Sequence, residues 1–198
     1  ATALLQVLYD LEDFEGVVDT ATALMEQDSG TLSVYLARGD ALLTLGDKEA
    51  AMEDFAKAVE LDGESAPALK RYAKSLCEAG HTGEGLVYYD DLVELRPEDT
   101  AALLGRANCY EIDQSWQDAL ADYLAVAEME DQNAAAAAGA GRMYVREKMF
   151  EEAEQYLNRS LELEPAASTY NALGLVHFQA HEYELALEAF QEGRAMDA

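Results

Sequence analysis

The sequence has few basic residues, few prolines and a single isoleucine. It carries 13 lysines and arginines against 40 aspartates and glutamates, which gives a formal net charge of −27. Nucleic acids and anionic membrane surfaces both repel such a chain. The charge therefore argues against either of them as a partner.

The sequence also lacks any long apolar run. None approaches the roughly 20 residues that cross a bilayer, so we expect no membrane insertion. No signal peptide is visible at the start, and the cytoplasm is the favoured location. Two cysteines do not make a disulfide scaffold, and Cys77 and Cys109 are interpreted as reduced, small hydrophobic residues.

What the chain does contain favours helix. Half of its residues are hydrophobic, which is enough for a continuous core, and alanine, leucine and glutamate are abundant. These residues are good helix formers, whereas the β-branched residues typical of strands are scarce. The composition favours helix over strand.

The clearest local pattern lies in residues 141–165. Its small and apolar residues recur at spacings of three and four, which is typical of two amphipathic helices; they are Gly141, Tyr144, Phe150, Ala153, Leu157 and Leu161. A polar joint at 146–148 separates the two helices, and Pro165 ends the second because proline cannot continue a helix interior. The stretch is predicted to be a helix–turn–helix hairpin.

The same pattern returns every 34 residues. Small residues recur on the first helix at Gly39, Ala73, Ala107, Gly141 and Gly174, and on the second at Ala51, Gly85, Ala119, Ala153 and Ala186. Five full units follow at 32–65, 66–99, 100–133, 134–166 and 167–198, and a truncated one occupies 1–31. The truncation leads us to expect a fragment of a longer chain.

A 34-residue helix–turn–helix period with small residues at fixed places resembles the tetratricopeptide repeat family. The resemblance covers residues 1–198 as one array of about six repeats. It implies a right-handed α-solenoid of antiparallel helix hairpins, in which the first helices line a concave groove that binds peptides in extended form. The implied function is a non-catalytic scaffold or adaptor for protein–protein interaction.

Charge is divided unevenly between the two kinds of helix. The six first helices, taken as 1–10, 32–45, 66–79, 100–113, 134–147 and 167–180, contain six acids and seven bases. The rest of the chain contains 34 acids and six bases. Basic and amide groups on the groove side suit carboxylates, so we expect an acidic or carboxylate-bearing peptide as the ligand. The alternative is that these bases only neutralise the acidic array from within.

The resemblance assigns a set of residues to the groove. They are Tyr9, Asp40, Lys70, Lys74, Asn108, Arg142, Arg146, Asn171 and Phe178. The set is similar to the carboxylate clamp of chaperone-binding repeats, but Lys70 pairs with Lys74 where the clamp has lysine and asparagine. Gly105 also stands where the clamp has asparagine.

No motif indicates catalysis or a cofactor. The chain has no phosphate-binding glycine loop and no nucleophile elbow. His177 and His181 are four residues apart on a helix, but two ligands without a third do not predict a metal site. Ala134 to Gly141 is interpreted as a closely packed helix, although a bare helix would leave room for a ligand side chain.

Two other functions remain open. A polar cap is not evident at the last helix, and some of its residues Leu185, Leu187 and Phe190 should be uncapped. The chain could therefore be a self-assembling module that forms homo-oligomers through its terminal repeats. It could also be the targeting or regulatory region of a larger enzyme.

Overall fold

The computed structural model describes residues 2–27 and 29–196 of the chain. Over these residues it contains twelve α-helices and no strand, as the resemblance to the repeat family implies. The helices are α1 (Thr2–Asp10), α2 (Phe14–Glu26), α3 (Leu32–Leu45), α4 (Lys48–Leu61), α5 (Ala66–Glu78), α6 (Thr82–Leu95), α7 (Thr100–Asp113), α8 (Trp116–Met129), α9 (Ala134–Glu147), α10 (Phe150–Leu163), α11 (Ala167–Gln179) and α12 (Tyr183–Met196).

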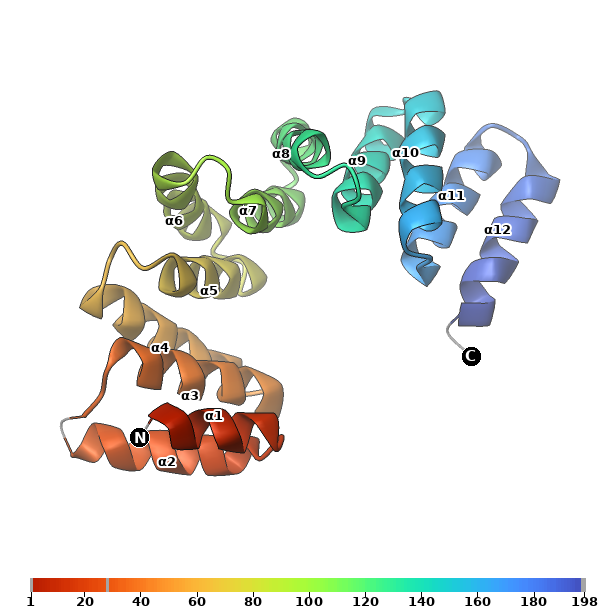
Figure 1. Ribbon diagram of the computed structural model, residues 1–198. Helices are drawn as coiled ribbons and strands as arrows, with labels where there is room; N and C mark the ends of the chain where they lie inside the picture. The colour runs from red at the N-terminus through yellow and green to blue at the C-terminus, as the bar shows by residue number, and fades with distance from the viewer. Residues whose placement is uncertain (1, 28, 197–198) are drawn as a thin grey trace. The chain divides into compact units, whose positions relative to one another are not determined.

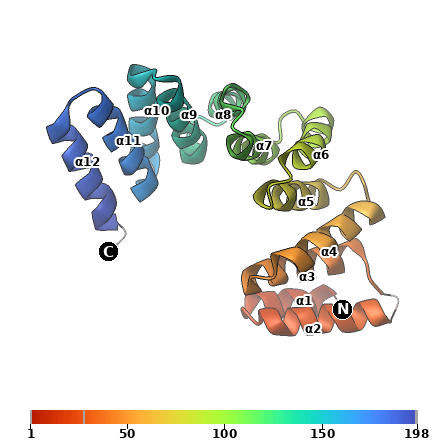
Figure 2. The ribbon, with the colours of Figure 1, turned by 180° about the vertical axis from the view of Figure 1, so that it is seen from behind.

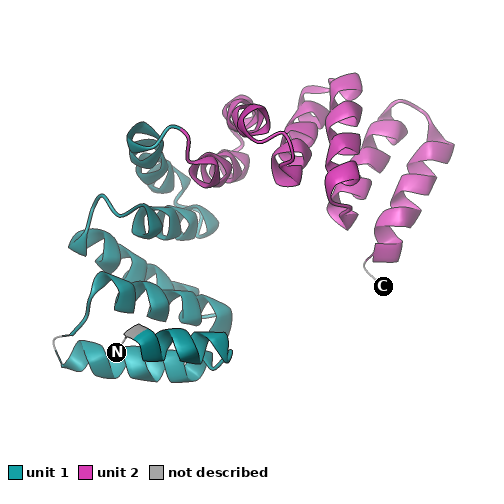
Figure 3. Ribbon diagram, in the orientation of Figure 1, with its two compact units in different colours: residues 1–97 teal, residues 98–198 magenta. Residues whose placement is uncertain are grey.

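Consecutive helices pair into antiparallel hairpins, which is clear for α9 with α10 and for α11 with α12 from both sides (Figures 1 and 2). The chain divides into two compact units, residues 1–97 and 98–198 (Figure 3). In the first unit each helix from α1 to α6 packs on the next, and in the second each from α7 to α12 does so. The all-α hairpin architecture is confirmed, whereas the superhelical hand and the single array stay predictions.

One backbone feature repeats with the sequence period. One or two residues after the first helix of each hairpin the backbone has a positive φ, at Gly46 and Gly80 and also at Glu12, Gln114, Lys148 and His181. This left-handed conformation ends the helix and lets the backbone N–H groups bond the last helical carbonyls. Only glycine adopts it without strain, so four of the six joints hold a residue that disfavours its own conformation.

Small residues let rings enter the hairpins. A Cβ built on Gly39 would lie 2.4 Å from the ring of Phe55, which is fully buried in the same hairpin. A Cβ on Gly139 would likewise lie 2.4 Å from the ring of Tyr123, which belongs to the preceding hairpin. Any larger residue at Gly39 or Gly139 would displace an aromatic side chain.

The expectation of two reduced thiols is wrong. Cys77 and Cys109 are both buried, and both are disulfide-bonded in the structure. The number of cysteines in a sequence does not report their oxidation state.

Candidate peptide-binding groove

In the first unit, Asp40 is engaged inside the protein. The Arg71 guanidinium donates to both of its carboxylate oxygens, at 2.7 and 2.8 Å, and this hydrogen bonding raises the pKa of Arg71. Lys74 is exposed and lies 3.7 Å from Glu78 on its own helix. These contacts satisfy two of the predicted groove residues without a ligand.

The remaining predicted residues of this unit are Tyr9 and Lys70. The Tyr9 ring packs edge-on against Phe14 with 5.4 Å between ring centroids, and it stays 39% exposed. Lys70 lies half-buried on α5, the helix that also carries Lys74. A cavity of about 70 Å³ in this unit, lined among others by Leu43, Met52 and Ser75, includes none of the four predicted residues.

The second unit has a hollow of about 550 Å³ between α9 and α11, which we call the α9–α11 groove. Its lining residues are Arg142, Val145, Arg146, Lys148, Ser168, Asn171, Ala172, Leu175 and Gln179. Three predicted residues, Arg142, Arg146 and Asn171, are thus brought together. Three cations line this groove, and its described lining contains no aspartate or glutamate.

Two of the groove cations have internal partners. Arg142 donates to Glu111 at 2.6 Å, and its guanidinium also lies 5.9 Å from the centroid of the Tyr123 ring. Arg146 stacks over the Trp116 ring at 4.6 Å, an attraction between a cation and the face of a π-system. These contacts orient both guanidinium groups, and the bond to Glu111 is made by Nη2 of Arg142.

Lys148 is a groove residue that the sequence interpretation missed. It is the exposed C-cap of α9 and has φ 60°, so the joint residue of the hairpin faces the groove. The polar run 146–148 predicted a turn but did not indicate the direction of its side chains. The recurrence of the joint at the same place in each repeat is the signal that could have assigned Lys148 to the groove.

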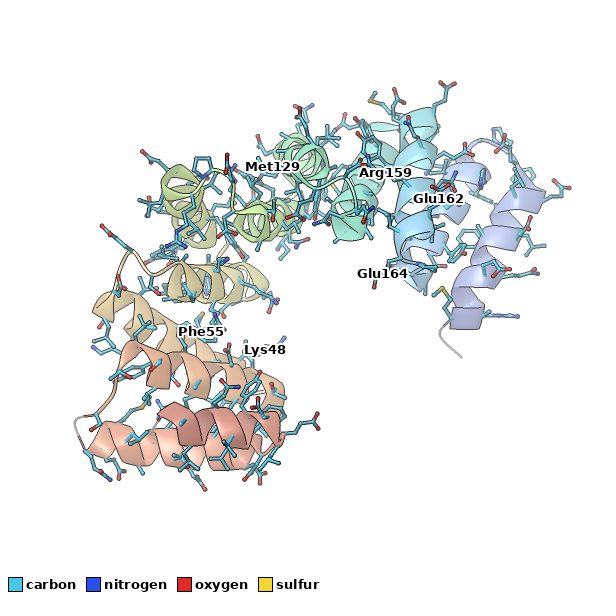
Figure 4. The ribbon with its side chains drawn as sticks, in the orientation of Figure 1. Lys48, Phe55, Met129, Arg159, Glu162 and Glu164 are labelled. Atoms are coloured by element: carbon cyan, nitrogen blue, oxygen red, sulfur yellow. The ribbon has the colours of Figure 1, made fainter. Side chains whose placement is uncertain are left out.

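A second hollow lies beside the groove, and we call it the α9 cavity. It measures about 320 Å³ and is lined by Leu104, Asn108, Tyr123, Ala134, Ala135, Ala138, Arg142, Ser160, Glu164, Ala166, Ser168 and Thr169. Arg142 and Ser168 line both hollows, so the two adjoin. Glu164 follows the last residue of α10 (Figure 4). The room foreseen above the alanine-rich helix is present, and the rest of that helix is closely packed, with Ala136, Ala137 and Ala140 buried.

Asn108 belongs to a partly buried hydrogen-bond network at the wall of this cavity. The Tyr123 hydroxyl lies 2.7 Å from the Asn108 side-chain oxygen and 2.5 Å from Glu111 Oε1. Burial raises the pKa of Tyr123 well above its usual value, and the bond to Glu111 raises it further. Tyr123 is therefore held neutral and acts as a donor that orients Glu111 toward Arg142.

Phe178 does not line either hollow. It is 53% exposed, and its ring lies edge-on to Tyr183 with 5.7 Å between centroids. Leu175, one turn earlier on α11, is the exposed apolar residue that reaches the groove lining.

The two histidines make separate contacts. His177 Nδ1 lies 2.8 Å from Glu182 Oε2, and His181 Nδ1 lies 2.9 Å from the Tyr183 hydroxyl. Across the described residues, no three histidine, cysteine, aspartate or glutamate side chains gather in a way that could hold a metal ion. Among the same residues no helix has the length and apolar character needed to cross a membrane.

The repeats identify the family. Tetratricopeptide-repeat models match residues 32–65, and residues 71–135 and 140–198, which together make up more than half of the chain. The chain belongs to the tetratricopeptide repeat family, and its fold is the all-α solenoid type of that family. No curated protein sequence matches the chain.

Solved structures agree on the fold. PilW, a widely conserved type IV pilus biogenesis factor, is similar with a TM-score of 0.85 and 17% identity over 95% of this chain and 88% of PilW. A tetratricopeptide repeat protein from Parabacteroides merdae gives a TM-score of 0.79 at 16% identity, over 100% and 77% of the two chains. MamA from Desulfovibrio magneticus RS-1 gives 0.73 at 17% identity, over 84% and 94%. Such low identities support the fold alone, and the family makes this chain a protein–protein interaction scaffold.

Proposed function

We propose that the chain is a non-catalytic scaffold that binds an extended acidic or carboxylate-bearing peptide in the α9–α11 groove. The observation that carries the proposal is the local reversal of charge. A chain with a net charge of −27 places Arg142, Arg146 and Lys148 around one hollow whose described lining has no acid. Asn171 and Gln179 add amide groups that can bond a peptide backbone.

Long-range repulsion does not prevent such binding. At physiological salt the screening length is about 8 Å, so acids elsewhere on the chain act weakly on a ligand in the groove. The groove cations act over contact distances, where charge-assisted hydrogen bonds are short and strong. We expect the affinity for an acidic peptide to fall as salt rises above this range.

Charge reversal tests the proposal. Fluorescence anisotropy with an acidic peptide should show a roughly tenfold larger Kd for the double variant Arg146→Glu/Lys148→Glu. This change corresponds to a loss of about 1.4 kcal/mol of binding free energy. Arg142 is kept because Glu111 depends on it. The matched control is Lys48→Glu/Arg194→Glu, which makes the same change at residues outside the groove lining. Equal binding by the two double variants would refute the proposal.

The protein offers its own optical probe of binding. Trp116 is the single tryptophan of the chain and lies beneath Arg146. A ligand carboxylate that binds the Arg146 guanidinium changes the environment of the Trp116 ring. Titration with the acidic peptide should therefore shift the Trp116 emission, and titration with its neutral glutamine version should not.

Self-assembly is the second candidate, and exposed apolar residues on the terminal helices favour it. On α12, Tyr183, Leu185 and Leu187 are 54%, 46% and 59% exposed, and on α1 Leu4 and Val7 are each 52% exposed. Sedimentation over a range of concentrations tests it. A rising mass that Leu185→Lys/Leu187→Lys abolishes would support assembly through this helix, and a constant monomer mass would exclude it.

A further inference from the structure

One position of the repeat distinguishes the helix that lines the α9 cavity. Ala138 stands where the other four full repeats carry Leu36, Lys70, Leu104 and Asn171. Each of those side chains is longer than a methyl group, and only at Ala138 is this inward position left nearly bare. The cavity of about 320 Å³ lies above it, within the second unit.

The cavity has an apolar floor and a polar rim. The apolar lining consists of Leu104 on α7, Ala134, Ala135 and Ala138 on α9, and Ala166 just before α11. The polar lining comes from five helices and the residue after α10, and comprises Asn108, Tyr123, Arg142, Ser160, Glu164, Ser168 and Thr169. A cavity lined by both apolar and hydrogen-bonding groups matches a side chain with an apolar body and a polar tip.

Arg142 connects this cavity to the α9–α11 groove. Its guanidinium already lies over the Tyr123 ring at 5.9 Å, so it is placed to hold a second ring on the cavity side. The same residue lines the groove in which we place the ligand carboxylate. One extended peptide can therefore set its acidic group in the groove and a neighbouring side chain in the cavity.

We infer that the α9 cavity is a side-chain subsite for an aromatic residue with a polar tip, a tyrosine above all, in the same acidic peptide that occupies the α9–α11 groove. The inference rests on the proposed function and narrows its ligand class. Tyrosine delivers a large contact area at low conformational cost, and its hydroxyl meets the polar rim.

The test uses short labelled peptides on the full chain. Each peptide ends in two aspartates with a free carboxylate, and a single tyrosine is moved through the preceding positions against an alanine background. One register should bind roughly tenfold more tightly than the peptide with alanine throughout, which corresponds to about 1.4 kcal/mol. Replacing both aspartates by asparagine and amidating the terminus reports on the groove separately.

A filled cavity provides the matched variant. Ala135 lines the cavity and is exposed, so Ala135→Leu should fill it without disturbing the core. This variant should lose the tyrosine gain and keep the dependence on the acidic end. Ala121→Leu, on the exposed surface of α8, is the control and should keep both. Ala134→Leu is a second filling variant, for use if the melting curve of the first differs from that of the parent.

Each outcome decides between the two claims. If no tyrosine register gains affinity while the acidic end still matters, the subsite is refuted and the groove stands. A tyrosine gain that survives the filling variants also refutes the subsite, because the ring must then bind elsewhere. If neither the acidic end nor the tyrosine affects binding, both the subsite and the proposed function are refuted.

Discussion

The Arg38 guanidinium donates two hydrogen bonds to the Asp54 carboxylate, from Nε at 2.7 Å and from Nη2 at 2.6 Å. The pair joins the first and second helices of one hairpin, and Asp54 is only 3% exposed. Two repeats later Arg106 makes the same two bonds to Asp122, each at 2.8 Å. The bond to Asp54 raises the pKa of Arg38, which keeps the guanidinium charged.

Replacing Arg38 should lower the free energy of unfolding more than replacing Asp54. Arg38→Met leaves the Asp54 carboxylate buried without its partner and should lower the free energy of unfolding by about 3 kcal/mol. Asp54→Ala leaves Arg38, whose side chain is 24% exposed and can turn toward water, so about 1–2 kcal/mol is expected. Urea denaturation followed by circular dichroism measures both, and equal losses would contradict this account.

The chain itself contains a replacement for the pair. In the intervening repeat the same two positions hold Tyr72 and Tyr88, whose rings meet edge-on with 5.0 Å between centroids. The double variant Arg38→Tyr/Asp54→Tyr should therefore be more stable than either Arg38→Met or the single Arg38→Tyr, because no buried charge remains. A double variant as unstable as the sum of its single changes would show that the two hairpins pack differently.

The 34-residue period predicts the helices because every hairpin must present small and apolar residues at the same places to pack. Charge counting was less successful, since it assigns a residue to a helix but not to one of its faces. Arg38 and Arg106 counted toward a basic groove, yet each turns to a second-helix aspartate 16 residues later. Such a spacing has no helical periodicity and becomes visible only when it recurs after 68 residues.

The groove shows a similar division. Arg142, Arg146 and Asn171 were predicted because they share a face of their helices, and they do line one hollow. The pairing of Glu111 with Arg142 was not predicted, because a contact between successive hairpins leaves no local pattern. The cavity over Ala138 was foreseen only as bare space, since its depth depends on side chains from five helices.

Lys148 should show a conflict between stability and binding. Its φ of 60° is a conformation that glycine adopts at the equivalent Gly46 and Gly80. Lys148→Gly should raise the free energy of unfolding by about 0.5–1 kcal/mol and at the same time weaken binding of an acidic peptide. Gln114→Gly, at the same joint one repeat earlier, should stabilise the protein without changing the affinity. Equal affinity in both variants would remove Lys148 from the site.

Alkaline pH should destabilise the protein partly through Tyr123. Burial raises the pKa of Tyr123, so this hydroxyl keeps its proton in the folded state at a pH where the unfolded chain loses it, above about 10. The folded state then binds more protons, and stability falls as pH rises by about 1.4 kcal/mol per pH unit for this one group. Tyr123→Phe should reduce the slope of the free energy of unfolding against pH by that amount. Part of the slope should remain because burial also raises the pKa of Tyr89. Urea titrations at several alkaline pH values measure the slopes, and identical slopes would contradict the assignment.

Glu111 should limit how strongly the groove holds an acidic ligand. It accepts from Arg142 at 2.6 Å, in a pair whose side chains are 38% and 22% exposed, and so occupies the guanidinium that a ligand carboxylate would use. Glu111→Gln keeps an oxygen for the Tyr123 hydroxyl but removes the competing charge, and the affinity for an acidic peptide should rise about threefold to tenfold. The pKa of Tyr123 should fall in the same variant, because the bond to Glu111 is one of the causes that raise it.

The control for Glu111 is Glu147→Gln, which removes an exposed acid at the end of α9 and changes the net charge equally. If both variants gain the same affinity, the gain comes from the change in net charge, and Glu111 does not compete with the ligand for Arg142. If only Glu111→Gln gains and the Tyr123 titration moves with it, the ligand competes with Glu111 for Arg142. That result would show that Glu111 and the ligand carboxylate bind the same Arg142 guanidinium.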